Sequence, residues 1–510
     1  MTQCHALVTG VIRYHRSHRH PRRDRGSDCV NVLFITLDQF RGDSYGASGH
    51  PVVKTPTLDR LAALGVRLAR HYSQAAPCAP GRAALYTGTY QMNNRVVANG
   101  SPLEDRFDNV ARLARRAGYR PTLFGYTDQG LDPSRAHGRD DPRLDRYDGI
   151  LPGFAVGHYL PESQVTWVEY LRERGYDVPL GWAPALRGES ERPAEHSLTG
   201  FLTGKFLDWL DVQDAGWFAH VSFLRPHPPY AAAGEYSRRY DPADVDLPIA
   251  AVDAGERHPL HEAAVGFAYC AAPEGEDALR HLRAQYYGMI AEVDFHLGRI
   301  VAALEERGEF DDTIIVVTSD HGDQLGDHGL IEKLGFFPQS YHVIGIWRDP
   351  RSRHPGRVIE HFTENVDIAP TLAAALGVEV PAQFDGRVMS PLFDGLDVAW
   401  RTSVHYEWDY RALSLASATQ PWPFDRSLSR QNLAVSLNAE TAYVHFGDGS
   451  HLCFDLATDP TWRTPVTDTY RILAAAQEML AWRQEHLARE YTDLLLEPAR
   501  PGRWPSALRR

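Results

Sequence analysis

Continuous apolar runs mark the first four hundred residues of this chain. The clearest are residues 31–37 (Asn-Val-Leu-Phe-Ile-Thr-Leu) and 313–318 (Thr-Ile-Ile-Val-Val-Thr). A run with no polar alternation predicts a strand buried on both faces, as in a parallel sheet covered by helices. Further strands are expected at residues 122–126, 217–224 and 343–347.

Segments with helical spacing alternate with these strands. Helices are expected at residues 55–65, 109–117, 277–307 and 366–376. The first has clear boundary signals, with Thr55 as N-cap, Pro56 as first residue and Gly65 at the end. Alternating strands and helices predict an α/β fold with a large, mostly parallel sheet flanked by helices on both faces.

Two regions depart from this alternation. Residues 130–200 are rich in Pro, Gly, Asp and Arg, and we expect long loops over the active face that hold substrate determinants. From about residue 400 the apolar segments become short and alternate with polar positions, which predicts a small C-terminal antiparallel sheet. Its strands are expected at residues 403–407, 433–437, 441–446 and 451–455, followed by a helix over 468–487.

Composition narrows the possible functions. The 510 residues are 43% hydrophobic, enough for a large core, and the net charge of −13 argues against a nucleic-acid-binding surface. Five widely spaced cysteines without a Cys-x-x-Cys pair indicate a reducing compartment, and no apolar run is long enough to span a membrane. We therefore expect a cytoplasmic protein without a membrane partner.

Three stretches carry candidate chemistry. Asp38 and the pair Asp320–His321 each follow a buried strand, and such strand ends can meet at one edge of a parallel sheet. Two carboxylates and an imidazole suit Ca²⁺, Mg²⁺, Mn²⁺ or Zn²⁺, although a single Asp after a strand is more often a cap or turn residue. The third stretch, Pro77–Gly88, predicts a short helix with Cys78 at its N-terminus, where a buried structural thiol is the alternative reading.

The sequence Cys78-Ala-Pro80-Gly-Arg82, followed by Ala-Leu-Tyr-Thr-Gly, resembles the signature of the sulfatase family in the alkaline phosphatase superfamily. The blocks at residues 31–43, 224–230 and 319–333 extend this resemblance. Within the superfamily the chain is most similar to phosphonate monoester hydrolases, which also cleave phosphodiesters and some sulfate esters. The resemblance runs from about residue 30 to the C-terminal helix.

The resemblance implies a nucleophile and a metal site. Cys78 would be oxidised to formylglycine by a formylglycine-generating enzyme, and one hydroxyl of the hydrated aldehyde would attack phosphorus or sulfur. The other hydroxyl would later expel the transferred group by C–O cleavage. Asp38, Asp320 and His321, together with residue 78, would hold one divalent ion, and Gln39 is a further candidate ligand.

It also implies roles around the substrate, a small anionic ester. Arg82 would orient the diol, while His227 and Lys333 would contact substrate oxygens, and either could protonate the leaving group. Lys333 is one of only three lysines in the chain. Asn99 and Tyr126 match positions that line the relatives' pocket, although both could be ordinary loop and strand residues.

The chain departs from the family pattern in ways that bear on the substrate. Gln39 stands where many sulfatases carry a second acid. Many sulfatases also carry a later Gly-Tyr-x-Thr…Gly-Lys motif, whereas Gly118-Tyr119-Arg-Pro-Thr of this chain does not continue to that Lys. Both departures favour the phosphonate and phosphodiester branch. Asp128 stands where those relatives carry a neutral hydroxyl residue. A carboxylate there would repel an anionic substrate unless it is paired.

The resulting domain prediction is a basic disordered extension (residues 1–28), a sulfatase-like catalytic α/β domain (29–400) and a C-terminal unit of small sheet, helix and arm (401–510). The predicted function is metal-dependent hydrolysis of phosphonate monoesters or phosphodiesters. The alternatives are a true sulfatase and a non-catalytic binding protein on the same fold. A homo-oligomer is expected by analogy with relatives.

Overall fold

The computed structural model describes residues 30–178, 181–416 and 427–487. The expected extension at residues 1–28 and the arm after residue 487 lie outside these ranges, as do Cys4 and Cys29. Within the described ranges no helix combines the length and apolar character needed to cross a membrane.

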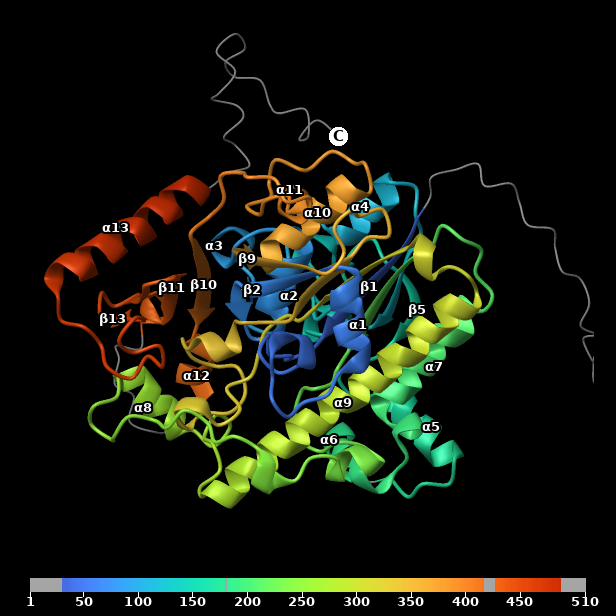
Figure 1. Ribbon diagram of the computed structural model, residues 1–510, viewed down its shortest axis with the longest axis horizontal. Helices are drawn as coiled ribbons and strands as arrows, with labels where there is room; N and C mark the ends of the chain where they lie inside the picture. Colours follow the sequence, from blue (N-terminus) through green and yellow to red (C-terminus); the bar gives the residue numbers. More distant parts are fainter. Residues whose placement is uncertain (1–29, 179–180, 417–426, 488–510) are drawn as a thin grey trace, which may run out of the picture.

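An eight-stranded sheet forms the framework of the molecule, with strand order β5-β4-β6-β1-β7-β8-β2-β9 (Figure 1). Every neighbouring pair is parallel except those made by β8, which runs antiparallel to β7 and β2. The large, mostly parallel sheet expected from the sequence is confirmed. Its strands are β1 (Asn31–Leu37), β2 (Val66–Tyr72), β4 (Pro121–Gly125), β5 (Ala155–Tyr159), β6 (Phe218–Phe223), β7 (Thr313–Thr318), β8 (Gly345–Arg348) and β9 (Arg357–Glu364).

Helices pack on both faces of this sheet, so the core has two layers. Leu33 and Ile35 of β1 pack with one group of helices, and Val32 and Phe34 of the same strand pack with the other. This explains the continuous apolar run in β1. The first group is α1 (Pro56–Leu64), α5 (Val165–Glu173), α6 (Trp182–Arg187), α7 (Leu198–Leu210) and the long α9 (Glu276–Glu306); the second is α2 (Cys78–Thr87), α4 (Val110–Arg116), α10 (Ile368–Ala375) and α11 (Ser390–Phe393).

A second, five-stranded sheet lies beside the first, in the order β13-β12-β11-β10-β3. The four C-terminal strands are antiparallel, as expected, but the edge strand β3 comes from residues just before Cys78 and pairs in parallel with β10. Helix α13 packs on β11 and β12 at the edge of the molecule (Figure 1). The remaining elements are β3 (Ala75–Ala76), β10 (Ser403–Asp409), β11 (Asn432–Asn438), β12 (Thr441–Phe446), β13 (His451–Asp455), α3 (Gln91–Asn94), α8 (Pro259–Val265), α12 (Arg411–Ala416) and α13 (Thr469–His486).

The expectation of long loops over residues 130–200 was wrong in part. This region contains the edge strand β5, helices α5 and α6, and the start of α7. β5 has no fully buried residue, so it lacks the apolar run that reveals an inner strand. Helix α7 carries Gly200 and Gly204, which lower its helix propensity, and it forms because it packs on α9 and the sheet.

Strands β2 and β9 were also missed. β2 carries three basic residues and β9 carries exposed charges, so neither shows a continuous apolar pattern. The two strands pair with each other, which only the tertiary structure brings about.

Candidate active site

Candidate residues gather at the carboxyl ends of four neighbouring parallel strands. Asp38 follows β1, Asp320 and His321 follow β7, Tyr126 follows β4, and His227 lies in the loop after β6. Because β4, β6, β1 and β7 are adjacent in the sheet, their ends bring these side chains to one place.

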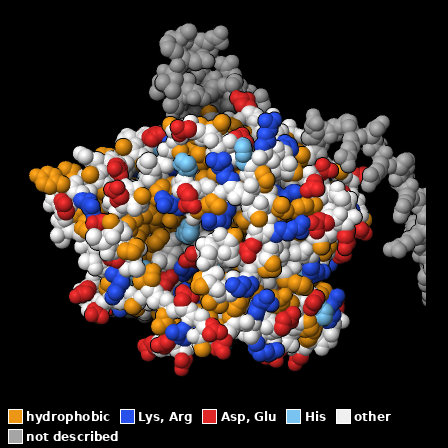
Figure 2. Space-filling model, viewed as in Figure 1, with side chains coloured by type: hydrophobic (Ala, Val, Ile, Leu, Met, Phe, Trp, Pro, Cys, Tyr) orange, Lys and Arg blue, Asp and Glu red, His pale blue; other side chains and the backbone are white. Residues whose placement is uncertain are grey.

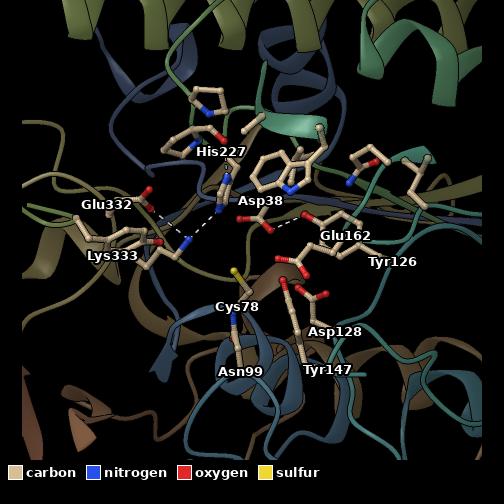
Figure 3. Close-up of a pocket in the computed structure, with 18 of the residues that line it drawn as sticks. Asp38, Cys78, Asn99, Tyr126, Asp128, Tyr147, Glu162, His227, Glu332 and Lys333 are labelled. Atoms are coloured by element: carbon tan, nitrogen blue, oxygen red, sulfur yellow. Dashed lines mark hydrogen bonds and ion pairs between the residues drawn. The ribbon is translucent and has the colours of Figure 1, made fainter. Parts of the chain in front are cut away.

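Cys78 is the first residue of α2 and faces these strand ends (Figure 3). Its Sγ lies 3.3 Å from Nε2 of His321, and burial raises the pKa of the thiol well above its usual value. Candidate ligand atoms of Asp38, Cys78, Asp320 and His321 all lie within 4.8 Å of one another. Three of the four predicted metal ligands thus surround the fourth, Cys78.

This group fits a divalent cation. All four side chains are buried, and Oδ1 of Asp38 has no hydrogen-bond partner among the described residues. A buried carboxylate oxygen without a partner is costly unless a cation or water satisfies it. Two carboxylates, an imidazole and an oxygen or sulfur at residue 78 form a donor set suited to several divalent ions.

Arg82 holds the two carboxylates together. It is fully buried one turn after Cys78, and its Nε and Nη2 donate to Asp320 Oδ2 (2.9 Å) and Asp38 Oδ2 (3.1 Å). Its Nη1 donates to Ser222 Oγ at 2.8 Å. Burial disfavours ionisation of Asp38, but nearby cationic side chains, Arg82 among them, hold its pKa well below the usual range.

A second group of polar side chains centres on Lys333. Lys333 Nζ donates to Oε1 of Gln39 (3.0 Å), contacts Oε2 of Glu332 (3.2 Å) and lies 2.8 Å from Nε2 of His227. The amide nitrogen of Gln39 donates to Asp323 at 2.6 Å. Gln39, the further candidate ligand, therefore uses both ends of its side chain to link Lys333 and Asp323.

Asn99 and Tyr126 both line the cavity of the site. Asn99 Oδ1 accepts a hydrogen bond from the backbone N–H of Ala79 in the first turn of α2, and the Tyr126 hydroxyl donates to Asp38 Oδ2 at 2.5 Å. Asp128 also faces the cavity. Burial raises its pKa to about 7, while Arg82 Nε lies 3.8 Å from its Oδ2 and acts against that rise. Asp128 is the residue that departs from the family pattern, and Arg82 partly compensates the negative charge of its carboxylate.

The cavity has a volume of about 500 Å³. Besides the predicted residues, segments between 147 and 187 contribute Tyr147, Glu162, Gln164, Trp182 and Arg187 to its wall. These five residues were not predicted one by one, but they come from the region expected to hold substrate determinants. Ser222 was missed as well, because a serine inside an apolar strand gives no sequence signal.

The comparisons with known proteins agree with this architecture. The sequence profile of the family described as "Sulfatase" matches residues 30–378. The chain belongs to the sulfatase family. The fold and the hydrolase class expected from the sequence are thereby confirmed.

Individual relatives of this sulfatase-family chain cover almost its whole length. It is 36% identical to the multifunctional alkaline phosphatase superfamily protein PehA of Trinickia caryophylli, over 92% of this chain and 98% of the relative. Its structure is similar to that of the phosphonate monoester hydrolase of Agrobacterium radiobacter (41% identity, 90% and 96% of the two chains, TM-score 0.81). The phosphonate monoester hydrolase SpPMH of Silicibacter pomeroyi is also similar (34% identity, 91% and 97%, TM-score 0.81).

Proposed function

We propose that this sulfatase-family hydrolase cleaves phosphonate monoesters and phosphodiesters, with formylglycine formed from Cys78 as nucleophile. The observation that supports this most is the convergence of Asp38, Asp320 and His321 on residue 78 at the N-terminus of α2. Substantial identity to phosphonate monoester hydrolases over nine-tenths of the chain supports the substrate class.

Asp38, Asp320, His321 and residue 78 would hold one divalent ion, for which Ca²⁺, Mn²⁺, Mg²⁺ and Zn²⁺ are all candidates. Such an ion would lower the pKa of a hydroxyl on residue 78 and offset the negative charge of the transferred group. Arg82 fixes the spacing of the two carboxylates through its forked contacts and partly neutralises their charge.

Lys333 is proposed as the proton donor to the leaving group. His227 Nδ1 lies 2.7 Å from the carbonyl oxygen of Pro228, which can only accept, so Nδ1 carries the ring proton. Nε2 of His227 then presents its lone pair to the Lys333 ammonium. His227 thus positions Lys333, and of the two residues considered, Lys333 is the one with a proton to give.

The alternative is a true sulfatase, and a binding protein without catalysis is the second alternative. The test compares kcat/KM for matched 4-nitrophenyl esters: a methyl phosphodiester, a phenylphosphonate and a sulfate. Higher rates on the two phosphorus esters support the proposal, higher rates on the sulfate favour a sulfatase, and no turnover of any ester by metal-loaded protein would support the binding protein.

Conversion of Cys78 is tested separately by peptide mass spectrometry of the protein from its native host. Oxidation of a cysteine thiol to an aldehyde lowers the peptide mass by about 18 Da. The peptides with Cys270 and Cys453, which are free buried thiols, serve as internal controls and keep their masses. An unshifted Cys78 peptide would contradict the formylglycine mechanism.

Three further expectations belong to this proposal. A formylglycine-generating enzyme acts on the chain before use, the protein forms a homo-oligomer, and it works in the cytoplasm. The free thiols of Cys78, Cys270 and Cys453 are compatible with that compartment. Basic and acidic side chains are mixed on the face in Figure 2, which fits the expectation that nucleic acid is not a partner.

A further inference from the structure

The cavity has two chemically different sides. His227 and Lys333 lie on one side, and Asp128, Tyr147 and Glu162 lie on the other, with Cys78 between them (Figure 3). A phosphodiester has one anionic centre and two organic arms. If the anionic centre is held near Cys78 and Lys333, one arm is directed to the acidic side.

Hydrogen-bond acceptors dominate that acidic side. The Asp128 residue is 6% exposed, and its one ionic partner among the described residues is Arg82 at 3.8 Å. Gln164 is 4% exposed, and its Oε1 has no hydrogen-bond partner in the part of the chain that the structure describes. Buried acceptors without donors are costly unless a ligand supplies the donor.

Aromatic rings complete this side of the cavity. Tyr147 and Trp182 line it, and the Glu162 carboxylate helps to raise the pKa of the Tyr147 hydroxyl, after the larger effect of burial. The Glu162 backbone is fixed, because its N–H donates to Asp148 Oδ2 at 3.0 Å. Carboxylates beside aromatic faces form a suitable environment for an organic cation. Arg187, a further cation of the described lining, is exposed, as Glu162 is, and its longer side chain can turn to solvent.

We propose that one arm of the natural substrate carries an ammonium group on a short alkyl chain, bound by Asp128, Glu162 and the Oε1 of Gln164. This rests on the proposed function and specifies its substrate class: a phosphodiester or phosphonate ester of an amino alcohol. The ammonium supplies the N–H donors that the buried Asp128 and Gln164 lack, and its charge explains why a carboxylate is present where an anionic substrate alone would be repelled.

The test uses three esters that share the 4-nitrophenyl leaving group and differ only in the second arm: 2-aminoethyl, 2-hydroxyethyl and propyl 4-nitrophenyl phosphate. We expect kcat/KM for the aminoethyl ester to exceed that for the propyl ester by about tenfold or more, with the hydroxyethyl ester between them. Equal values for the three esters would overturn the proposal.

Two variants locate the effect. Asp128→Asn and Glu162→Gln should each lower the ratio of aminoethyl to propyl kcat/KM several-fold, and this ratio is the readout. Asn tolerates the left-handed backbone of Asp128 (φ 50°), so that substitution preserves the local conformation. Glu173→Gln, on the exposed end of α5, is the matched control and leaves the ratio unchanged. An unchanged ratio in both cavity variants would contradict the assignment.

Failure of the proposed function is recognised separately. If none of the three esters is hydrolysed, titration calorimetry with phosphoethanolamine and propyl phosphate tests the subsite by binding alone. Tighter binding of phosphoethanolamine, lost in Glu162→Gln, supports it; equal affinities refute it.

Discussion

Nζ of Lys333 lies 2.8 Å from Nε2 of His227, and the opposite nitrogen of that ring points at the Pro228 carbonyl. Although burial opposes its charge, the neighbouring Glu332 carboxylate helps to raise the pKa of the Lys333 ammonium well above its usual value. The same lysine lowers the pKa of His227, after the larger effect of burial. The pair therefore consists of a charged lysine and a neutral histidine.

This relationship predicts different losses for the two residues. Lys333→Ala should lower kcat about 10²–10⁴-fold for a diester with an alkyl leaving group, and much less for a 4-nitrophenyl leaving group that needs no proton. His227→Ala should show the same dependence with a smaller loss, because Lys333 remains. The measurement is kcat against leaving-group pKa, with the exposed Lys54→Ala as control. Equal losses for both leaving groups would rule out proton donation.

Removal of Arg82 should destabilise the protein. Arg82→Met leaves the carboxylates of Asp38 and Asp320 buried without their shared cation, which costs about 3–5 kcal/mol of unfolding free energy in metal-free protein. Urea unfolding with and without added divalent ion measures this, and the ion should recover part of the loss. Arg139→Met, at an exposed position, is the control. A loss below about 1 kcal/mol would show that the carboxylates do not need Arg82.

The two ends of β7 offer a matched pair for the metal site. Asp320 follows the strand and belongs to the candidate ligand group, whereas Asp312 precedes it and is exposed. Asp320→Asn should weaken metal affinity by about tenfold or more, and Asp312→Asn should leave it unchanged. Elemental analysis after dialysis against a metal buffer gives the answer. Identical metal content in the two variants would exclude Asp320 as a ligand.

Glu292 in α9 predicts a pH dependence of stability. Burial and the nearby Glu189 raise its pKa to about 8, from 4.5 in the unfolded chain. The folded state then binds more protons than the unfolded state between these values, so this residue's contribution to stability falls as pH rises from about 4.5 to 8. Glu292→Gln removes the ionisation.

The unfolding free energy of Glu292→Gln relative to wild type should therefore be greater at pH 9 than at pH 4. Urea unfolding at both pH values measures the difference. Glu306→Gln, exposed at the end of the same helix, should show no such change. A pH-independent difference for Glu292→Gln would contradict the raised pKa.

The sequence predicted well those features that depend on burial in the centre of the sheet. The runs of β1 and β7 are apolar on both faces, so their positions and the acids after them could be predicted from local pattern alone. The antiparallel direction of β8 could not, because strand direction depends on how the chain returns to the sheet. Edge strands such as β9 carry charges and lack that pattern.

The same distinction holds within the site. Motif residues such as Cys78 and Asp320 were predicted from their neighbours in the chain. Contacts across the fold, such as that between His227 and Lys333 over 106 residues, were not. Likewise, the tertiary fold decides whether a hydrogen-bond donor lies close to Oε1 of Gln164, and no local sequence pattern encodes this.

The parallel pairing of β3 with β10 affects the order in which the site can mature. β3 ends two residues before Cys78, and its partner strand β10 lies at the start of the last fifth of the chain. Until β10 emerges from the ribosome, β3 lacks the strand with which it pairs. In the complete fold, Cys78 is 5% exposed. If an enzyme oxidises Cys78, as proposed above, it would find the segment before α2 without its β-sheet partner until the last fifth of the chain is made.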